Sequence, residues 1–189
     1  MIWFTSDLHL GHASIIRHGY RPYSTVRHMN DRLVGSINDR VSWTDDLWIL
    51  GDFSHGISAD EVARYRERIN CRNVYLVRGN HDLHFPEGAS PFSQELDYYE
   101  GLRTSGLERR RIVMCHYPIA DWNGLNGGAI HLHGHIHAKM SYNERNRERG
   151  LLRYDVGVDA NGYAPVSLAS IEAFFAGVEP AAVHHQDVL

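Results

Sequence analysis

Short apolar runs alternate with longer amphipathic stretches over the first eighty residues of the chain. Residues 2–6, 47–50 and 74–77 are rich in aromatic and branched aliphatic side chains, a pattern that predicts β-strands. Apolar side chains recur at helical spacing over residues 25–41, and a capping box at residues 58–61 predicts the start of a second helix. This strand–helix–strand order is typical of a parallel sheet covered by helices.

The pattern changes after Pro86, where the apolar runs become shorter and are separated by glycine-rich or charged turns. The predicted β segments are about 96–100, 112–115, 130–132 and 152–158. We expect this half to form mainly antiparallel or mixed sheet, with the charged residues 143–150 as a turn within a hairpin. Residues 168–176 are predicted to form a closing helix, and the tail 179–189 to be frayed.

Composition narrows the class of protein. A chain of 189 residues without repeats or linkers predicts one domain, residues 1–189. The formal charge of −4 argues against a general binder of polyanions, and no apolar window approaches a membrane span of about 20 residues. We therefore expect a cytoplasmic protein with no membrane association, whose two cysteines, Cys71 and Cys115, are reduced. The sequence does not specify an oligomeric state.

Polar clusters follow or interrupt five of the apolar runs. They are Asp7-Leu8-His9, Gly51-Asp52, Gly79-Asn80-His81-Asp82, His116 and Gly134-His135-Ile136-His137. Ligands of α/β sheets gather at the carboxyl ends of strands, and buried carboxylates and imidazoles at such ends usually require a cation. The sequence therefore predicts a two-metal hydrolytic site.

The residue types indicate separate tasks within this site. If the extended conformation persists, Asp7 and His9 project to the same side, and so do His135 and His137. Asp52 has two oxygens with which to bridge two cations. These are borderline ligands, suited to manganese, iron, zinc or cobalt.

The ordered motifs resemble those of the calcineurin-like metallophosphoesterases, from residue 5 to about 137. The opening segment 5–12 and the late segment 156–159 are similar to small stand-alone bacterial and phage members. The resemblance implies a mixed α/β fold: a four-layer α-β-β-α sandwich of two mixed sheets flanked by helices.

The resemblance also implies roles for the site residues. The implied ligands are Asp7, His9 and His137 for the first metal, Asn80, His116 and His135 for the second, and Asp52 for both. His81 would be a general acid rather than a ligand, and a hydroxide shared by the metals would attack phosphorus. We expect two divalent transition metal ions, manganese first, with iron, zinc, cobalt or nickel as alternatives.

One stretch departs from related phosphoprotein phosphatases, which carry Gly-Asp-x-x-Asp-Arg-Gly. Residues 51–56 here lack both the second aspartate and the arginine, which argues against that activity. His12 and His55 are the candidate substrate-binding residues; alternatively, each hydrogen-bonds a metal ligand or a backbone carbonyl.

The predicted function is hydrolysis of phosphomonoesters or phosphodiesters, including nucleotides. A small phosphoester is the expected partner, and nucleic acid is a weaker expectation that depends on two arginine-rich segments, 109–111 and 145–153. The alternatives are a protein-interaction scaffold on the same fold and a nuclease. Cys115 is expected to face the core, and His131 and His133 to support the site from behind or lie at the surface.

Overall fold

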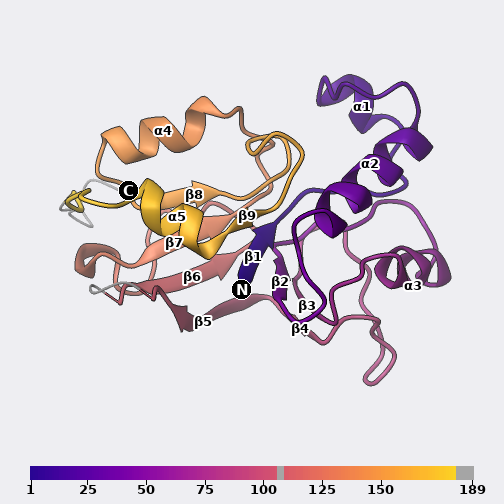
Figure 1. The fold of residues 1–189 in the computed structure, drawn as a ribbon, viewed down its shortest axis with the longest axis horizontal. Helices are drawn as coiled ribbons and strands as arrows, with labels where there is room; N and C mark the ends of the chain where they lie inside the picture. Colours follow the sequence, from indigo (N-terminus) through magenta and orange to yellow (C-terminus); the bar gives the residue numbers. More distant parts are fainter. Residues whose placement is uncertain (106–108, 182–189) are drawn as a thin grey trace.

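The computed structural model describes residues 1–105 and 109–181, and shows two β-sheets flanked by helices (Figure 1). This is the mixed α/β sandwich that the sequence predicts. Residues 182–189, most of the tail predicted to be frayed, lie outside the described residues. Within the described ranges, no helix is long and apolar enough to cross a membrane.

The first sheet has the strand order β4-β3-β2-β1-β9. Its strands are β1 (Ile2–Thr5), β2 (Asp46–Ile49), β3 (Asn73–Val77), β4 (Gln94–Leu96) and β9 (Val166–Ser167). Strands β1 to β4 run parallel, and β9 pairs antiparallel with β1. The parallel order brings the carboxyl ends of β1, β2 and β3 to one edge.

The second sheet has the order β5-β6-β7-β8. Its strands are β5 (Tyr98–Arg103), β6 (Arg111–Cys115), β7 (Ile130–His133) and β8 (Arg153–Asp155). Only β5 and β6 are antiparallel, so the sheet is mixed. The single strand predicted near 96–100 is divided in the structure, because β4 joins the first sheet and β5 the second.

Most of the core lies in two layers, one on each face of the first sheet, and a smaller cluster surrounds Val113 and Trp122. Phe4, Trp48 and Leu50 pack against Met114 and Leu132 of the second sheet, forming the core between the sheets. The alternate side chains of the first sheet pack against the helices of the opposite face. This double burial explains why residues 47–50 form an unbroken apolar run.

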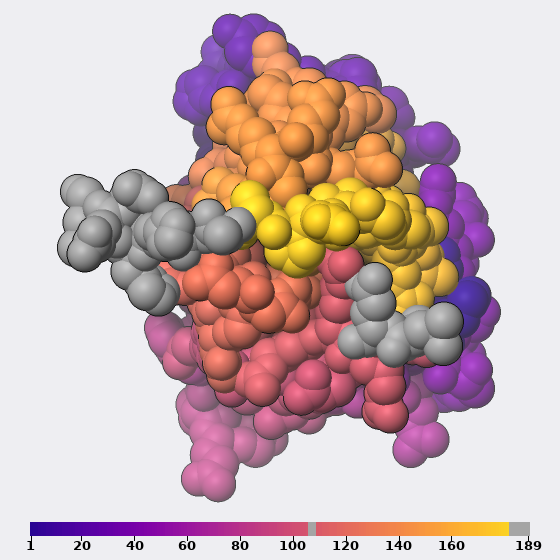
Figure 2. All heavy atoms as spheres, turned by 90° about the vertical axis from the view of Figure 1, so that its left-hand side faces the viewer, coloured from indigo at the N-terminus to yellow at the C-terminus, as the bar shows by residue number. Residues whose placement is uncertain are grey.

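Helices α1 (Ile15–His18), α2 (Val26–Asn38) and α3 (Ala59–Glu67) lie beside the first sheet, while α4 (Ser141–Glu148) and α5 (Leu168–Phe174) lie on the side of the second. A short 3₁₀ turn, η1, spans Leu125–Gly127. The predicted capping box is present at the start of α3, where Ser58 and Glu61 bond each other's backbone N–H. Figure 2 shows α4 (orange) and α5 (yellow) side by side on one face of the molecule.

Helix α4 corrects the prediction that residues 143–150 form a hairpin turn, since it connects the parallel strands β7 and β8. Its buried side chains are polar. Asn143 accepts from the N–H of Asp155 at 2.7 Å and donates to the carbonyl of Asp155 at 3.0 Å, and Asn146 donates to the carbonyl of Arg153. A helix attached by amides has no apolar periodicity for a sequence pattern to detect.

Candidate metal centre

The loops that follow β1, β2, β3, β6 and β7 meet at one edge of the sandwich, and they carry all eight residues predicted for the metal site and its general acid. Asp7, His9 and His137 each place a ligand atom within 4.8 Å of the others. Asp7, Asp52 and His116 form a second such group. Because Asp7 belongs to both groups, the two clusters are contiguous.

The left-handed backbone of the loops produces this convergence. The φ angles are 57° at Asp7, 51° at His9, 53° at Asp52, 74° at His135 and 46° at His137. These values contradict the extended conformation assumed from the sequence, and non-glycine residues adopt them at some cost in free energy. As a result His135 faces His116, whereas the ligand atom of His137 lies near those of Asp7 and His9.

Glycines make room for the ligands at the same edge. A Cβ added at Gly79 would lie 2.3 Å from Asp52 Oδ1, and one added at Gly134 would lie 2.4 Å from Asp7 Oδ2. A Cβ added at Gly51 would lie 2.2 Å from Nδ1 of the His116 ring. The glycines in three of the predicted motifs thus permit close approach of backbone to ligand side chains.

The first group carries a buried nitrogen that fits a cation. His9 Nε2 has no hydrogen-bond partner among the described residues, although it lies 3.4 Å from Asp52 Oδ2. Burial lowers the pKa of His9, which favours the neutral imidazole that metals bind. Burial also raises the pKa of Asp7 to about 8, with the charges of Asp155 and Asp52 adding to the rise against that of His137. The ionised form of Asp7 is therefore disfavoured in this structure, and a bound cation would favour it.

The three residues predicted to bind the second metal, Asn80, His116 and His135, fit a cation equally well. His116 Nδ1 lies 2.8 Å from the carbonyl oxygen of Leu50, so Nδ1 holds the proton and Nε2 presents a lone pair. Asn80 Oδ1 and His135 Nδ1 each lie 3.2 Å from that Nε2. Acceptor atoms this close to one another form a set that a cation satisfies.

Asp52 lies between the ligands predicted for the first metal and those predicted for the second. Its Oδ2 is 3.4 Å from His9 Nε2 and 3.6 Å from His116 Nε2, and its Oδ1 accepts from the backbone N–H of His81 at 2.9 Å. Burial acts to raise the pKa of Asp52, but the His9 imidazole, the His81 N–H and the charge of His116 together lower it to about 2. The carboxylate is therefore ionised at neutral pH.

His81 lies beside these groups and outside both of them. Its ring is exposed and its centroid is 5.4 Å from that of His9. The edge-to-face contact between His81 and His55 has a centroid distance of 4.5 Å. This arrangement leaves the His81 ring nitrogens available for proton transfer.

His12 and His55 occupy different positions relative to the centre. Their rings stack at 3.9 Å, and His12 Nδ1 lies 3.1 Å from His9 Nδ1 while its Nε2 lies 2.8 Å from Ser14 Oγ. Burial, followed by the charges of His55 and His9, lowers the pKa of His12 to about 4. This geometry favours the alternative in which His12 supports a ligand, and it leaves His55 as the candidate nearer to His81.

Asp82 had no predicted role, although it ends a predicted motif. Its carboxylate accepts from the backbone N–H groups of Asp52, Phe53 and Gly79, each at 2.8 Å. It thereby joins the loops that follow β2 and β3. Its place directly after His81 was the only signal in the sequence.

The histidines and cysteines that were not predicted to be ligands differ in burial. His131 and His133 are fully buried, so the surface location is wrong: each bonds a backbone carbonyl, of Val113 and of Gly134 respectively. Cys71 and Cys115 are both free thiols, and Cys115 is only half-buried.

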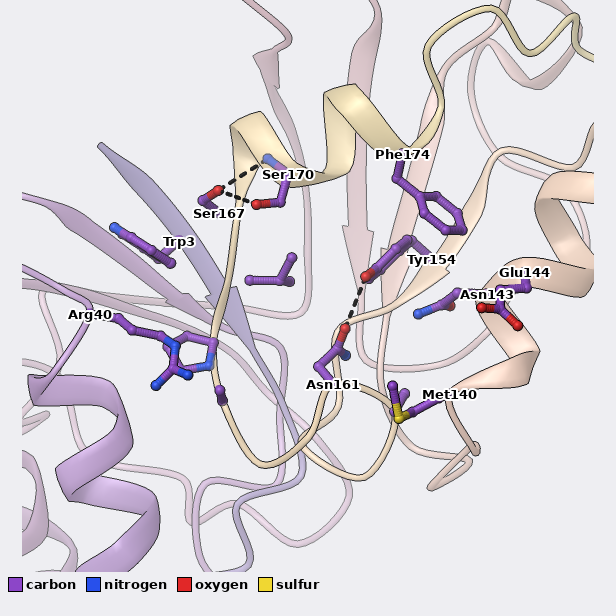
Figure 3. Close-up of a pocket in the computed structure, with 14 residues that line it drawn as sticks. Trp3, Arg40, Met140, Asn143, Glu144, Tyr154, Asn161, Ser167, Ser170 and Phe174 are labelled. Atoms are coloured by element: carbon purple, nitrogen blue, oxygen red, sulfur yellow. Dashed lines mark hydrogen bonds between the residues drawn. The ribbon is translucent and has the colours of Figure 1, made fainter.

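A separate cavity of about 510 Å³ lies beside β9 and the start of α5 (Figure 3). Trp3, Tyr154 and Phe174 are among its lining residues, and the Tyr154 hydroxyl donates to Asn161. None of the predicted site residues lines it. The chemistry of the molecule is therefore concentrated at the strand ends.

Comparison with known proteins agrees with this geometry. The family model of calcineurin-like phosphoesterases matches residues 1–161. An uncharacterized protein of Methanocaldococcus jannaschii is 29% identical over 170 residues, covering 88% of this chain and 86% of its own length. The gene 66 protein of Mycobacterium phage D29 is 29% identical over 181 residues, covering 84% of this chain and 88% of its own length.

Among solved structures, a protein of unknown function from Aquifex aeolicus has the same fold, with a TM-score of 0.71 and 22% identity. The similarity covers 92% of this chain and 98% of that one. A family match that spans most of the sequence, together with an aspartate–histidine centre suited to divalent cations, identifies the protein class. The chain belongs to the calcineurin-like phosphoesterases.

Proposed function

We propose that the protein is a dinuclear-metal phosphoesterase that hydrolyses small phosphomonoesters or phosphodiesters, nucleotides among them. One observation supports this most strongly: ligand atoms from both sheets converge in two adjoining groups, while an exposed imidazole lies beside them. A protein-interaction scaffold has no need for such an imidazole. We therefore rank the scaffold below the enzyme.

The first cation would be held by Asp7, His9 and His137, and the second by Asn80, His116 and His135. Asp52, which faces both groups, would contact both cations. Manganese is our first candidate, because nitrogen and oxygen donors are mixed in each set. Bound divalent cations supply Lewis acidity toward phosphoryl oxygens and lower the pKa of water.

His81 would donate a proton to the departing ester oxygen. The hydrogen bond from its backbone N–H to Asp52 and the ring of His55 at 4.5 Å hold it beside the centre. Its imidazole is exposed, so it can exchange protons with solvent between turnovers. General acid catalysis of this kind typically contributes about 10²–10⁴-fold to a rate.

The arginine-rich segments support a small substrate over nucleic acid. Arg111 begins β6, whereas His116 follows the other end of that strand. Arg145 and Arg147 lie on α4, where Arg145 donates to Ser141 and Arg147 to the carbonyl of Phe174. Arg111 pairs with Glu100 and Arg153 donates to the carbonyl of Ile119, so these two arginines are directed to groups other than the predicted ligands.

The decisive experiment starts from metal-free protein that is reloaded with Mn²⁺. We expect cleavage of a nitrophenyl phosphate, its bis-ester or a 2′,3′-cyclic nucleotide, and the relative rates will define the substrate class. Asp52→Ala should abolish turnover and weaken both metal sites, while Asp97→Asn, which changes an exposed carboxylate, should do neither. Two bound metals with no cleavage of any ester would contradict the enzyme and favour the scaffold.

A further inference from the structure

A buried ion pair lies directly behind the first group of ligands. Arg21 and Asp159, which are 138 positions apart in sequence, form a two-pronged contact: Nε to Oδ1 at 2.9 Å and Nη2 to Oδ2 at 2.8 Å. The side chain of Arg21 is fully buried and that of Asp159 is 9% exposed. A buried pair of this kind is costly to desolvate, so stability alone is a weak explanation for its presence.

Asp159 also contacts a predicted ligand. Its Oδ2 lies 2.7 Å from His137 Nδ1, and an ionised carboxylate only accepts hydrogen bonds. His137 therefore carries its proton on Nδ1, which leaves the lone pair of Nε2 directed toward Asp7, 4.0 Å away. The carboxylate thus selects the tautomer of His137 that can bind a metal.

Arg21 contacts the loop that carries the other two ligands of this group. Its Nη2 donates to the carbonyl of Asp7 at 2.7 Å and its Nη1 to the carbonyl of Leu8 at 3.0 Å. These bonds hold backbone that is in the left-handed region at Asp7 and His9. The fifth N–H of the guanidinium is directed at Met29 Sδ, so none is left for a substrate phosphate.

We propose that Asp159 and Arg21 are positioning residues for the first metal site: Asp159 fixes the tautomer and direction of His137, and Arg21 fixes Asp159 and the Asp7–His9 loop. This inference depends on the proposed function. At the second site, His116 is held by the carbonyl of Leu50 and not by a carboxylate. Loss of the pair should therefore affect one metal and spare the other.

The test compares Mn²⁺ binding to metal-free wild type and Asp159→Asn. The amide can donate to Nδ1 and stabilise the wrong tautomer, so affinity at one of two sites should fall about 10- to 100-fold, with the other unchanged. The electron paramagnetic resonance spectrum should change from that of a coupled manganese pair to that of a single ion. Asp31→Asn, which removes the carboxylate of the exposed Arg68–Asp31 pair, should bind as wild type does.

Two further measurements keep the inference testable if Asp159→Asn does not fold. Arg21→Lys keeps the charge but cannot make the two-pronged contact, and it should weaken the same single site. Nitrogen NMR of metal-free wild type at alkaline pH should show His137 protonated on Nδ1; the Nε2–H tautomer would refute the inference.

The outcomes separate the two proposals. Wild type that binds no Mn²⁺ overturns both the proposed function and this inference. Wild type and variants that bind two ions with equal affinity overturn the inference alone, as would variants that lose both sites equally. Wild type that binds two ions without cleaving esters, while Asp159→Asn loses one, leaves the inference intact and removes the activity.

Discussion

At the scale of single residues, the predicted ligands and the predicted proton donor differ in burial and in contacts. The predicted ligands are mostly buried and face one another, whereas His81 is exposed and contacts the centre through its backbone N–H and its neighbour His55. Residue types at strand ends indicated a metal site, and the resemblance to the calcineurin-like family implied which residue has which role. The partners behind them were not predicted, because Arg21 and Asp159 come together only in the folded chain.

Replacement of His81 by alanine tests this division. We expect His81→Ala to bind two metals as wild type does, since the imidazole is not a ligand, while kcat falls about 10²–10⁴-fold. Metal content and kcat of the purified variant are the measurements. His84→Ala removes an exposed imidazole three residues away and should leave both unchanged. Loss of metal from His81→Ala would show that His81 is a ligand.

At the scale of elements, apolar periodicity predicted the strands and helices whose buried side chains are apolar. The strands β1, β2 and β3 and helix α2 lie close to their predicted positions, because their side chains pack in one of the two cores. Helix α4 was missed because its buried side chains, Asn143 and Asn146, are amides. The two-residue β9 and three-residue β4 are too short to produce a periodic signal.

Removal of the Asn143 amide should release α4 from β8. Asn143→Ala leaves the buried N–H of Asp155 without its partner and removes one of two donors to the Asp155 carbonyl, which keeps the Asn161 amide. We expect this to cost roughly 1–3 kcal/mol in the free energy of unfolding. Urea denaturation measures this loss. Glu144→Ala, at the exposed neighbouring position, should change the free energy by less than about 0.5 kcal/mol. Equal effects of the two substitutions would contradict the role of the amide.

At the scale of the whole molecule, the second sheet carries buried histidines on the face that is turned away from the first sheet. His131 lies between the carbonyls of Val113 and Tyr117 and near the ring of Trp122. Burial lowers its pKa to about 4, against an ordinary value of 6.5. The folded protein thus keeps this imidazole neutral where the unfolded chain would protonate it.

Stability should consequently fall in mild acid. The contribution of His131 is complete above pH 6.5, where both states are neutral, and is progressively lost as the pH falls toward 4, because the unfolded chain binds a proton that the native state excludes. Between pH 7.5 and 5 this amounts to roughly 2 kcal/mol. Urea denaturation at both pH values should show a smaller difference for His131→Gln, and an unchanged difference for the exposed His18→Gln. An equal pH dependence in all three proteins would contradict this assignment.

The predicted ligands come from both sheets. Asp7, His9, Asp52 and Asn80 follow strands of the first sheet, while His116, His135 and His137 follow strands of the second. Cations bound there would cross-link the two sheets at one end of their shared core. A relative that lost its metal ligands would therefore lose a connection between the two sheets as well as its catalytic activity. To remain folded as a scaffold, it would need new side-chain packing at the same edge in place of the bound cations.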